Sequence, residues 1–333
     1  MAGNPRGERG LASAPMTPPA SSPTIRPFRF STPIGEVDDR RSLRDRARLL
    51  EDLGYSTATV PDHFDRQLGP FATMMAVAEA TSSMRVASLV LSNDYRHPAV
   101  VAKETATIDL LTEGRLEVGI GAGWKVTDYE QSGIPHDDAT TRIERMGEAI
   151  TIVKGLWGEE PVHFEGRHYR IAGLVGTPRP HQRPHPPLMV GGGGRIVLQL
   201  AAREADIVAL NPMMVSGQID QTTGATATPE ATDRRLEWIR EAAADRFDDL
   251  ELHVRLQLAL VVDDPDPLYE SLAGGFGLTP DQARQTPYAI AGPPESMIDT
   301  LIERRERWGF SYIGVPAEAA EAMAPVVAKL VGS

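Results

Sequence analysis

The sequence contains no cysteine among its 333 residues. This absence excludes disulfide bonds, thiolate metal sites and a cysteine nucleophile. Basic runs are missing as well, and the formal net charge is -12, so the electrostatic footprint of a protein that binds nucleic acid or an anionic membrane is lacking. No apolar segment approaches the roughly 18 to 20 residues needed to span a bilayer. We therefore expect a cytoplasmic protein that acts on a small molecule.

The first 27 residues are rich in proline, serine, glycine and arginine, and they include no apolar core like that of a secretory signal. We therefore expect a disordered leader over residues 1–27. The remaining chain, residues 28–333, is expected to form a single domain. Its hydrophobic content is sufficient for a large core, since 41% of the whole sequence is hydrophobic.

From residue 28 onward, short apolar or β-branched runs alternate with helical patterns, which is typical of a parallel α/β architecture. Eight runs are predicted to be strands: 28–31, 57–60, 85–91, 116–120, 188–190, 207–210, 253–262 and 312–315. Eight parallel strands in about 300 residues predict a (β/α)8 TIM barrel with insertions. The pattern alone also fits a doubly wound sheet. Segments 215–229 and 265–287 are expected to be irregular, and 124–138 is predicted to be a long loop.

A run of four glycines is the most informative feature of the chain. The run comprises Gly191, Gly192, Gly193 and Gly194, between an apolar stretch and a helical pattern that begins at Arg195. Without Cβ atoms, backbone N–H groups can approach a phosphate closely, and the positive end of the helix dipole adds to the attraction. The run therefore predicts a phosphate-binding turn. A tight strand-to-helix turn without a ligand has the same backbone needs and stays open as an alternative.

Polar and aromatic side chains follow three of the predicted strands. Asp62 and His63 come after the second strand, and a carboxylate with an imidazole is the usual basis of acid–base chemistry near neutral pH. Asn93 follows the third strand, and Gly123 and Trp124 follow the fourth. Because the C-terminal ends of barrel strands meet at one mouth, we expect all five near the glycine run. A capping role for Asp62 and a packing role for Trp124 remain alternatives.

Other kinds of chemistry have little support in the sequence. No cluster of histidine, aspartate and glutamate has metal-ligand spacing, and no Gly-x-Ser-x-Gly elbow is present, so we expect neither a metal site nor a serine hydrolase. Residues 177–187 are dense in proline and lead into the N-terminal end of the fifth strand. They are predicted to be a rigid connector at the N-terminal end of a barrel, where residues contribute to stability and not to catalysis.

Four stretches together resemble the bacterial luciferase-like monooxygenase superfamily. They are S-T-A-T-V-P-D-H-F at 56–64, Y-R-H-P-A at 95–99, L-L-T-E-G-R-L-E-V-G-I-G-A-G-W at 110–124 and P-L-M-V-G-G-G-G at 187–194. The similarity runs in order from about residue 28 to residue 330. Within the superfamily, the chain most resembles the actinobacterial oxidoreductases that use the deazaflavin coenzyme F420.

The resemblance implies a TIM barrel with a flavin or deazaflavin ring across its C-terminal mouth and the cofactor phosphate at the glycine run. It also implies a third-strand bulge with a non-proline cis peptide behind the ring, within residues 88–90. The implied cofactor contacts are Asp62, Leu89, Asn93, Gly123, Trp124, Gly191, Gly192, Gly193 and Gly194. Sugar-phosphate dehydrogenases of the superfamily have a glutamate where Trp124 stands, so a sugar phosphate is not the expected substrate.

The leading hypothesis is an oxidoreductase that passes a hydride between F420 and a small, uncharged organic substrate. His63 would be the catalytic acid or base, Asp62 would orient it or touch the ring, and Trp124, Met213 and Met214 would form an apolar pocket. The alternative is a monooxygenase that uses reduced FMN from a separate reductase. Besides a reductase, a second copy of the chain is a candidate partner, in a homodimer. A cofactor-free barrel that binds a phosphorylated ligand would explain the glycines but not Asp62 or His63.

Overall fold

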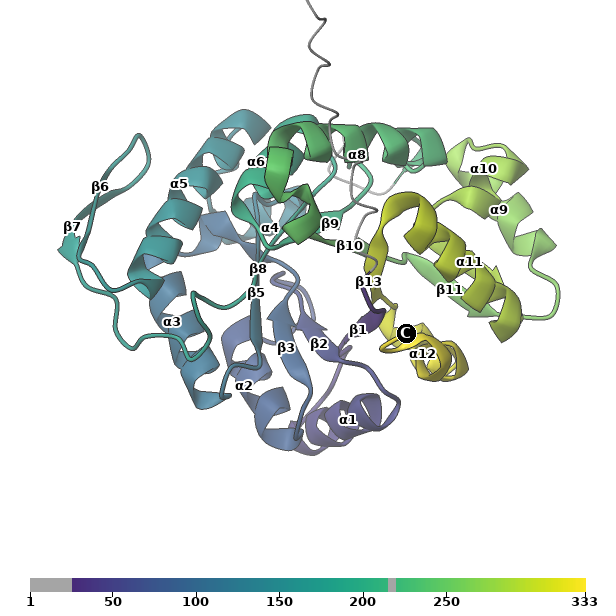
Figure 1. Ribbon diagram of the computed structural model, residues 1–333, viewed down its shortest axis with the longest axis horizontal. Coiled ribbons are helices and arrows are strands. Elements are labelled where there is room, and N and C mark those ends of the chain that lie inside the picture. Colours follow the sequence, from purple (N-terminus) through teal and green to yellow (C-terminus); the bar gives the residue numbers. More distant parts are fainter. Residues whose placement is uncertain (1–25, 215–219) are drawn as a thin grey trace, which may run out of the picture.

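The computed structural model describes residues 26–214 and 220–333. Its centre is a closed barrel of parallel strands surrounded by helices (Figure 1). Around the barrel the order is β1, β2, β3 with its continuation β4, β5, β8, β9, β10 and β13, and β13 pairs with β1. The bounds are β1 Arg29–Pro33, β2 Thr57–Val60, β3 Arg85–Ser88, β4 Leu91–Ser92, β5 Leu116–Gly121, β8 Leu188–Gly192, β9 Ile207–Leu210, β10 Glu251–Arg255 and β13 Phe310–Gly314. The predicted TIM barrel is confirmed, and a doubly wound sheet is excluded.

Each barrel strand is followed by an outer helix, as the alternating sequence pattern predicts. These helices are α1 Arg40–Asp52, α2 Pro70–Ala80, α3 Pro98–Leu111, α5 Ala139–Trp157, α6 Arg195–Glu204, α8 Pro229–Ala243, α11 Pro294–Trp308 and α12 Ala324–Leu330. Local chemistry fixes where they begin. At the start of α5, the Asp138 carboxylate accepts hydrogen bonds from the N–H groups of Thr140 and Thr141. At the start of α3 stands Pro98, whose missing N–H would have had no partner within the helix. One face of α5 then buries Met146 and Ile150 in the core.

Two of the predicted strands are divided in the structure. The run 85–91 is interrupted at Leu89 and Val90, which lie between β3 and β4 and are joined by a cis peptide bond. The run 253–262 ends in the barrel at Arg255. Its remainder forms β11 (Leu258–Val261), which leaves the barrel and pairs with β12 (Ala289–Gly292), a strand that the sequence did not predict. In both runs β-forming apolar residues continue past the break without an intervening glycine or proline, so the sequence does not mark it.

Insertions between barrel elements hold the other differences. The predicted loop 124–138 contains α4 (Val126–Ser132), and the segment expected to be irregular at 265–287 contains α9 (Asp266–Phe276) and α10 (Pro280–Gln285). These helices are short or carry adjacent glycines, so their apolar periodicity is weak. The remaining elements are the hairpin β6 Val162–Glu165 and β7 Arg170–Leu174, α7 Gln221–Gly224, and the 3-10 turns η1 Asn93–Tyr95, η2 Ala244–Asp249 and η3 Ala317–Ala319. The hairpin projects from the barrel beside α5 (Figure 1).

Ion pairs around the buried carboxylate of Glu117 close the N-terminal end of the barrel. Arg29 of β1 contacts Glu117 of β5 and Glu251 of β10, each at 2.5 Å, and Arg85 of β3 lies 2.8 Å from Glu117. Although burial raises the pKa of Glu117, the charges of Arg29 and Arg85 hold it below its usual range. Gln182 of the proline-dense connector donates to the carbonyl of Leu116, so the connector lies at this end as predicted.

The predicted leader, apart from residues 26 and 27, lies outside the described residues, as do residues 215–219. In the part of the chain that the structure covers, no helix combines the length and the apolar character that crossing a membrane requires.

Candidate active site

A cavity of about 1050 Å³ occupies the C-terminal mouth of the barrel. Most of the residues that the sequence singled out line it: Asp62, His63, Leu89, Gly123, Trp124, Gly191, Gly192, Gly193 and Gly194, with Met213 and Met214. Asn93 is the exception. Its side chain is buried and its Nδ2 lies 3.4 Å from the hydroxyl of Tyr169, away from the cavity lining, where the backbone neighbour Ser92 takes its place.

His63 is held by a carboxylate that the sequence analysis missed. Its Nδ1 lies 2.6 Å from Oδ2 of Asp128 in α4, and the Asp128 side chain is nearly buried. The hydroxyl of Tyr95 donates to the same oxygen at 3.2 Å, while Nζ of Lys125 lies 3.7 Å from Oδ1. The imidazole also packs edge-on against Trp124, with the ring centroids 5.7 Å apart. Nδ1 is thus engaged by Asp128, which leaves Nε2 as the nitrogen that can exchange a proton with a ligand.

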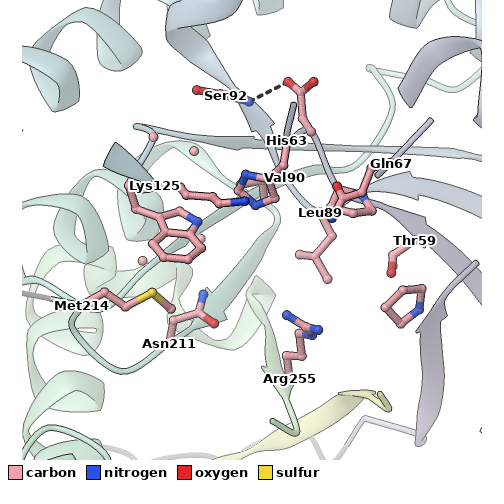
Figure 2. A pocket seen from close by; sticks show the side chains of 18 of the residues that line it. Thr59, His63, Gln67, Leu89, Val90, Ser92, Lys125, Asn211, Met214 and Arg255 are labelled. Atoms are coloured by element: carbon pink, nitrogen blue, oxygen red, sulfur yellow. Dashed lines mark hydrogen bonds between the residues drawn. The ribbon is translucent and has the colours of Figure 1, made fainter. Parts of the chain in front are cut away.

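Asp62 does not orient His63, in contrast to one of the roles expected for it. Its two carboxylate oxygens lie 2.5 and 2.9 Å from the guanidinium nitrogens of Arg96. Oδ2 also accepts the backbone N–H of Ser92 at 3.0 Å, which is the dashed line in Figure 2. Adjacent residues on an extended chain point to opposite sides, and here each finds its own partner. Asp62 thereby ties the end of β2 to the segment after β3 and still forms part of the cavity wall.

The break in the third strand forms a wall of the cavity. Leu89 and Val90 both line it, and Leu89 projects into the open space (Figure 2). Two glycines of the neighbouring β5 make room for this wall. A Cβ on Gly121 would meet a methyl group of Val90 at 2.5 Å, and one on Gly119 would meet the carbonyl oxygen of Ser88 at 2.1 Å. The glycines of the fourth strand are therefore required by packing against the third.

The glycine run divides into packing and open positions. A Cβ on Gly193 would come within 2.5 Å of the carbonyl oxygen of Asn211, and one on Gly192 would meet Val197 at 2.3 Å. Gly194, in contrast, has nothing within 4 Å of the position a Cβ would take. It precedes α6 without any side-chain cap, so the N–H groups of the first helical turn face the open space beside it. Gly194 is thus the position where a bound anion is most directly supported.

Three functional candidates were missed by the sequence analysis: Asp128, Asn211 and Arg255. Asp128 lies in a helix that the sequence analysis assigned to a loop. Arg255 was placed inside the predicted strand 253–262, whereas the barrel strand ends at this residue. Asn211 directly follows the strand that ends at Leu210, and its position at a strand end was the available signal. No cluster of three or more potential metal ligands occurs in residues 26–214 and 220–333.

Comparison with known proteins gives one family. The family model for luciferase-like monooxygenases matches residues 22–324. A relative from Pseudomonas putida, an FMNH2-dependent dimethylsulfone monooxygenase, is 28% identical over 293 residues, which cover 86% of this chain and 78% of that protein. An F420-dependent glucose-6-phosphate dehydrogenase from Amycolatopsis mediterranei is 32% identical over 174 residues, covering 50% of this chain and 52% of that protein.

Solved structures agree on the fold. The coenzyme F420-dependent tetrahydromethanopterin reductase from Methanopyrus kandleri superimposes with a TM-score of 0.73 at 17% identity, covering 92% of this chain and 99% of that one. At this level of identity the likeness concerns the arrangement of the barrel. Which reaction the barrel serves has to be argued from the cavity.

Proposed function

Because the chain belongs to the luciferase-like monooxygenase family, we propose that it transfers a hydride between F420 and a small organic substrate, with His63 as the acid–base group. Its relatives are F420-dependent or flavin-dependent oxidoreductases, so the chain is an enzyme of this class. One observation carries the finer proposal. The pair formed by His63 and Asp128 opens into the same cavity as the Leu89–Val90 wall and the glycine run.

The cavity residues fit a ring cofactor with a phosphate. Gly194 and the uncapped first turn of α6 would hold the phosphate, since the position lacks both a Cβ and any competing side chain. Leu89 and Val90 would back the ring, and Asn211 offers an amide at the end of β9. When bound, a deazaflavin or flavin supplies the hydride chemistry that no side chain can provide.

The side chains manage the proton that accompanies the hydride. Asp128 fixes the orientation of the His63 ring through Nδ1, so Nε2 is directed to the cavity, where it can donate or accept a proton at the substrate oxygen. Trp124, Met213 and Met214 line the cavity near this point and reduce the access of water. In this proposal the cofactor supplies the hydride chemistry, and the protein positions the substrate and transfers the proton.

A second candidate is a monooxygenase that uses reduced FMN from a separate reductase. The observation in its favour is coverage: the dimethylsulfone monooxygenase of Pseudomonas putida aligns with 86% of this chain, whereas the F420-dependent dehydrogenase aligns with 50%. The two candidates share the barrel and the His63–Asp128 pair, and they differ in which ring the cavity accepts.

Parallel titrations with F420 and FMN, in oxidised and reduced form, separate the candidates. We expect F420 to bind at least about tenfold more tightly than FMN, a difference of about 1.4 kcal/mol. A tenfold preference for FMN, together with substrate-dependent oxygen consumption when a reductase is added, would replace the first candidate by the second. Failure of both rings to bind would contradict the proposed function altogether.

A further inference from the structure

Arg255 is a guanidinium at the cavity wall that lacks a partner. It is the last residue of β10, and its side chain makes no hydrogen bond or ion pair with any residue that the structure describes. Its Nε is buried and unbonded. The guanidinium is half-buried, and its buried Nε–H has lost water without gaining an acceptor, which is costly. An arrangement of this kind is expected where a ligand supplies the missing acceptor.

The other buried or half-buried guanidinium groups near the cavity are bonded, and Arg66, which also lines it, is exposed to solvent. Arg96 is paired with both oxygens of Asp62, and Arg142 donates to the carbonyl oxygens of Ala122 and Gly123. Those two arginines hold the wall together. Burial lowers the pKa of Arg255, and the charge of Glu318 opposes this effect without forming an ion pair with it. Arg255 is therefore set apart by its chemistry as well as by its place.

Barrel topology puts Arg255 across the mouth from the Leu89–Val90 wall. Counted from β3 through β5, β8 and β9, β10 is the fourth strand, and counted through β2, β1 and β13 it is again the fourth. In Figure 2 the side chains of Leu89 and Arg255 point toward one another across the cavity. A ring backed by Leu89 would leave its free face toward Arg255, and a substrate must approach from that face.

The neighbour of Arg255 on the same face of β10 does not neutralise it. His253 lies two residues earlier, is 1% exposed, and has both ring nitrogens without a hydrogen-bond partner among the described residues. Burial and the charges of Arg29 and Arg255 lower the pKa of His253 to about 3, so it is neutral near pH 7. This side of the cavity thus presents the Arg255 guanidinium beside a neutral imidazole, with the carboxylate of Glu318, unpaired among the described residues, also in the lining.

On the basis of the proposed function, we propose that Arg255 binds the carboxylate or sulfonate group of the substrate. The substrate class is then a small organic acid, in place of the uncharged molecule expected from the sequence. A planar guanidinium matches two oxygens of such a group through parallel charge-assisted hydrogen bonds. Binding the anion at Arg255 would place the rest of the molecule between Arg255 and the free face of a ring backed by Leu89.

Matched pairs of ligands test this assignment. Propionate and methanesulfonate are compared with propionamide and dimethyl sulfone, which have similar shapes and no charge, by calorimetry on the cofactor-loaded protein and on the cofactor-free protein. We expect the anions to bind at least about tenfold more tightly than their neutral counterparts, as for a desolvated charge-assisted pair. Arg255→Gln should remove this preference, and Arg255→Lys should retain part of it.

Several outcomes would overturn the assignment. Equal affinity for anions and neutral ligands would do so, as would an anion preference that persists in Arg255→Gln. If Arg255→Gln weakens binding of the ring and leaves the ligand preference unchanged, Arg255 serves the cofactor instead. Glu318→Gln is the matched control, since loss of anion binding there as well would mean that Arg255 acts through Glu318. Thermal melts establish that each variant is folded. If neither ring binds, the proposed function fails, and titration of the cofactor-free protein still decides the role of Arg255.

Discussion

Nδ1 of His63 lies 2.6 Å from Oδ2 of Asp128, although the two residues are 65 positions apart in the sequence. The histidine follows β2 and the aspartate belongs to α4, so the pair forms only when two loops meet above the barrel. This contact gives one nitrogen of the imidazole a fixed partner and directs the other to the cavity.

Replacing His63 by alanine should remove proton transfer and little else. We expect turnover to fall by roughly two to four powers of ten, with the affinity for the cofactor nearly unchanged. Steady-state kinetics and a cofactor titration on the same preparation measure both quantities. Unchanged turnover would assign His63 to packing against Trp124.

Asp128→Asn should lower turnover because the carboxylate no longer holds the His63 ring in one orientation. A fall of about a hundredfold or more is expected, with a small change in KM. Asp137→Asn is the matched control, since Asp137 follows α4 and pairs with Arg145 at 2.8 Å without touching His63. Equal effects of the two substitutions would mean that the loop, and not the pair, is what matters.

Gly194→Asp should affect stability and cofactor affinity in opposite directions. An aspartate at this position can cap α6, which is worth a few tenths of a kcal/mol relative to glycine, so the melting temperature should be kept or slightly raised. The same carboxylate would stand where a phosphate has to bind, and we expect a loss of affinity of about a hundredfold.

Two controls accompany this substitution. Gly194→Ala places a Cβ in open space, and Arg183→Ala changes the connector near the opposite end of the barrel, so each should alter affinity by less than about threefold. If Arg183→Ala lowers the affinity and Gly194→Asp does not, the phosphate binds at the N-terminal end of the barrel and the assignment to Gly194 is wrong.

Gly121 and Val90 should behave as a coupled pair in unfolding experiments. Gly121→Ala forces a Cβ to within 2.5 Å of Val90 and should cost about 1 to 3 kcal/mol. Adding Val90→Ala should recover about 1 kcal/mol of this loss in a double-mutant cycle. The same second substitution should not rescue Gly119→Ala, whose Cβ meets the backbone oxygen of Ser88 at 2.1 Å. Urea denaturation of the single and double variants gives the coupling energies.

His253 should make the protein less stable in mild acid. Burial first, then the charges of Arg29 and Arg255, lower its pKa from 6.5 to about 3 in the folded state. Between these values the unfolded chain binds the additional proton, so the free energy of unfolding falls as the pH falls below 6.5, by up to about 1.4 kcal/mol per pH unit. His253→Asn should flatten this slope between pH 6.5 and 5. His181→Asn, at an exposed position, should leave it unchanged.

The sequence was sufficient for the barrel because apolar runs at regular intervals report buried strands directly. It also located His63 and the glycine run, since both stand where a strand ends. It could not supply Asp128 as the partner of His63, because contact between two loops depends on how they fold above the barrel. Arg255 was missed for a related reason. No glycine or proline in the run 253–262 marks the point where β10 ends and β11 leaves the barrel, and only an end position presents a side chain to the mouth.

The ion pairs around Glu117 have a practical consequence for engineering. Arg29 and Arg85 join β1, β3, β5 and β10 at the end of the barrel opposite the cavity, so closure of the barrel does not depend on the connections above the mouth. The segment that carries α9 and α10 contributes no residue to these ion pairs. We therefore expect substitutions at its exposed positions to leave this end of the barrel intact, which makes them the first sites at which to vary selectivity.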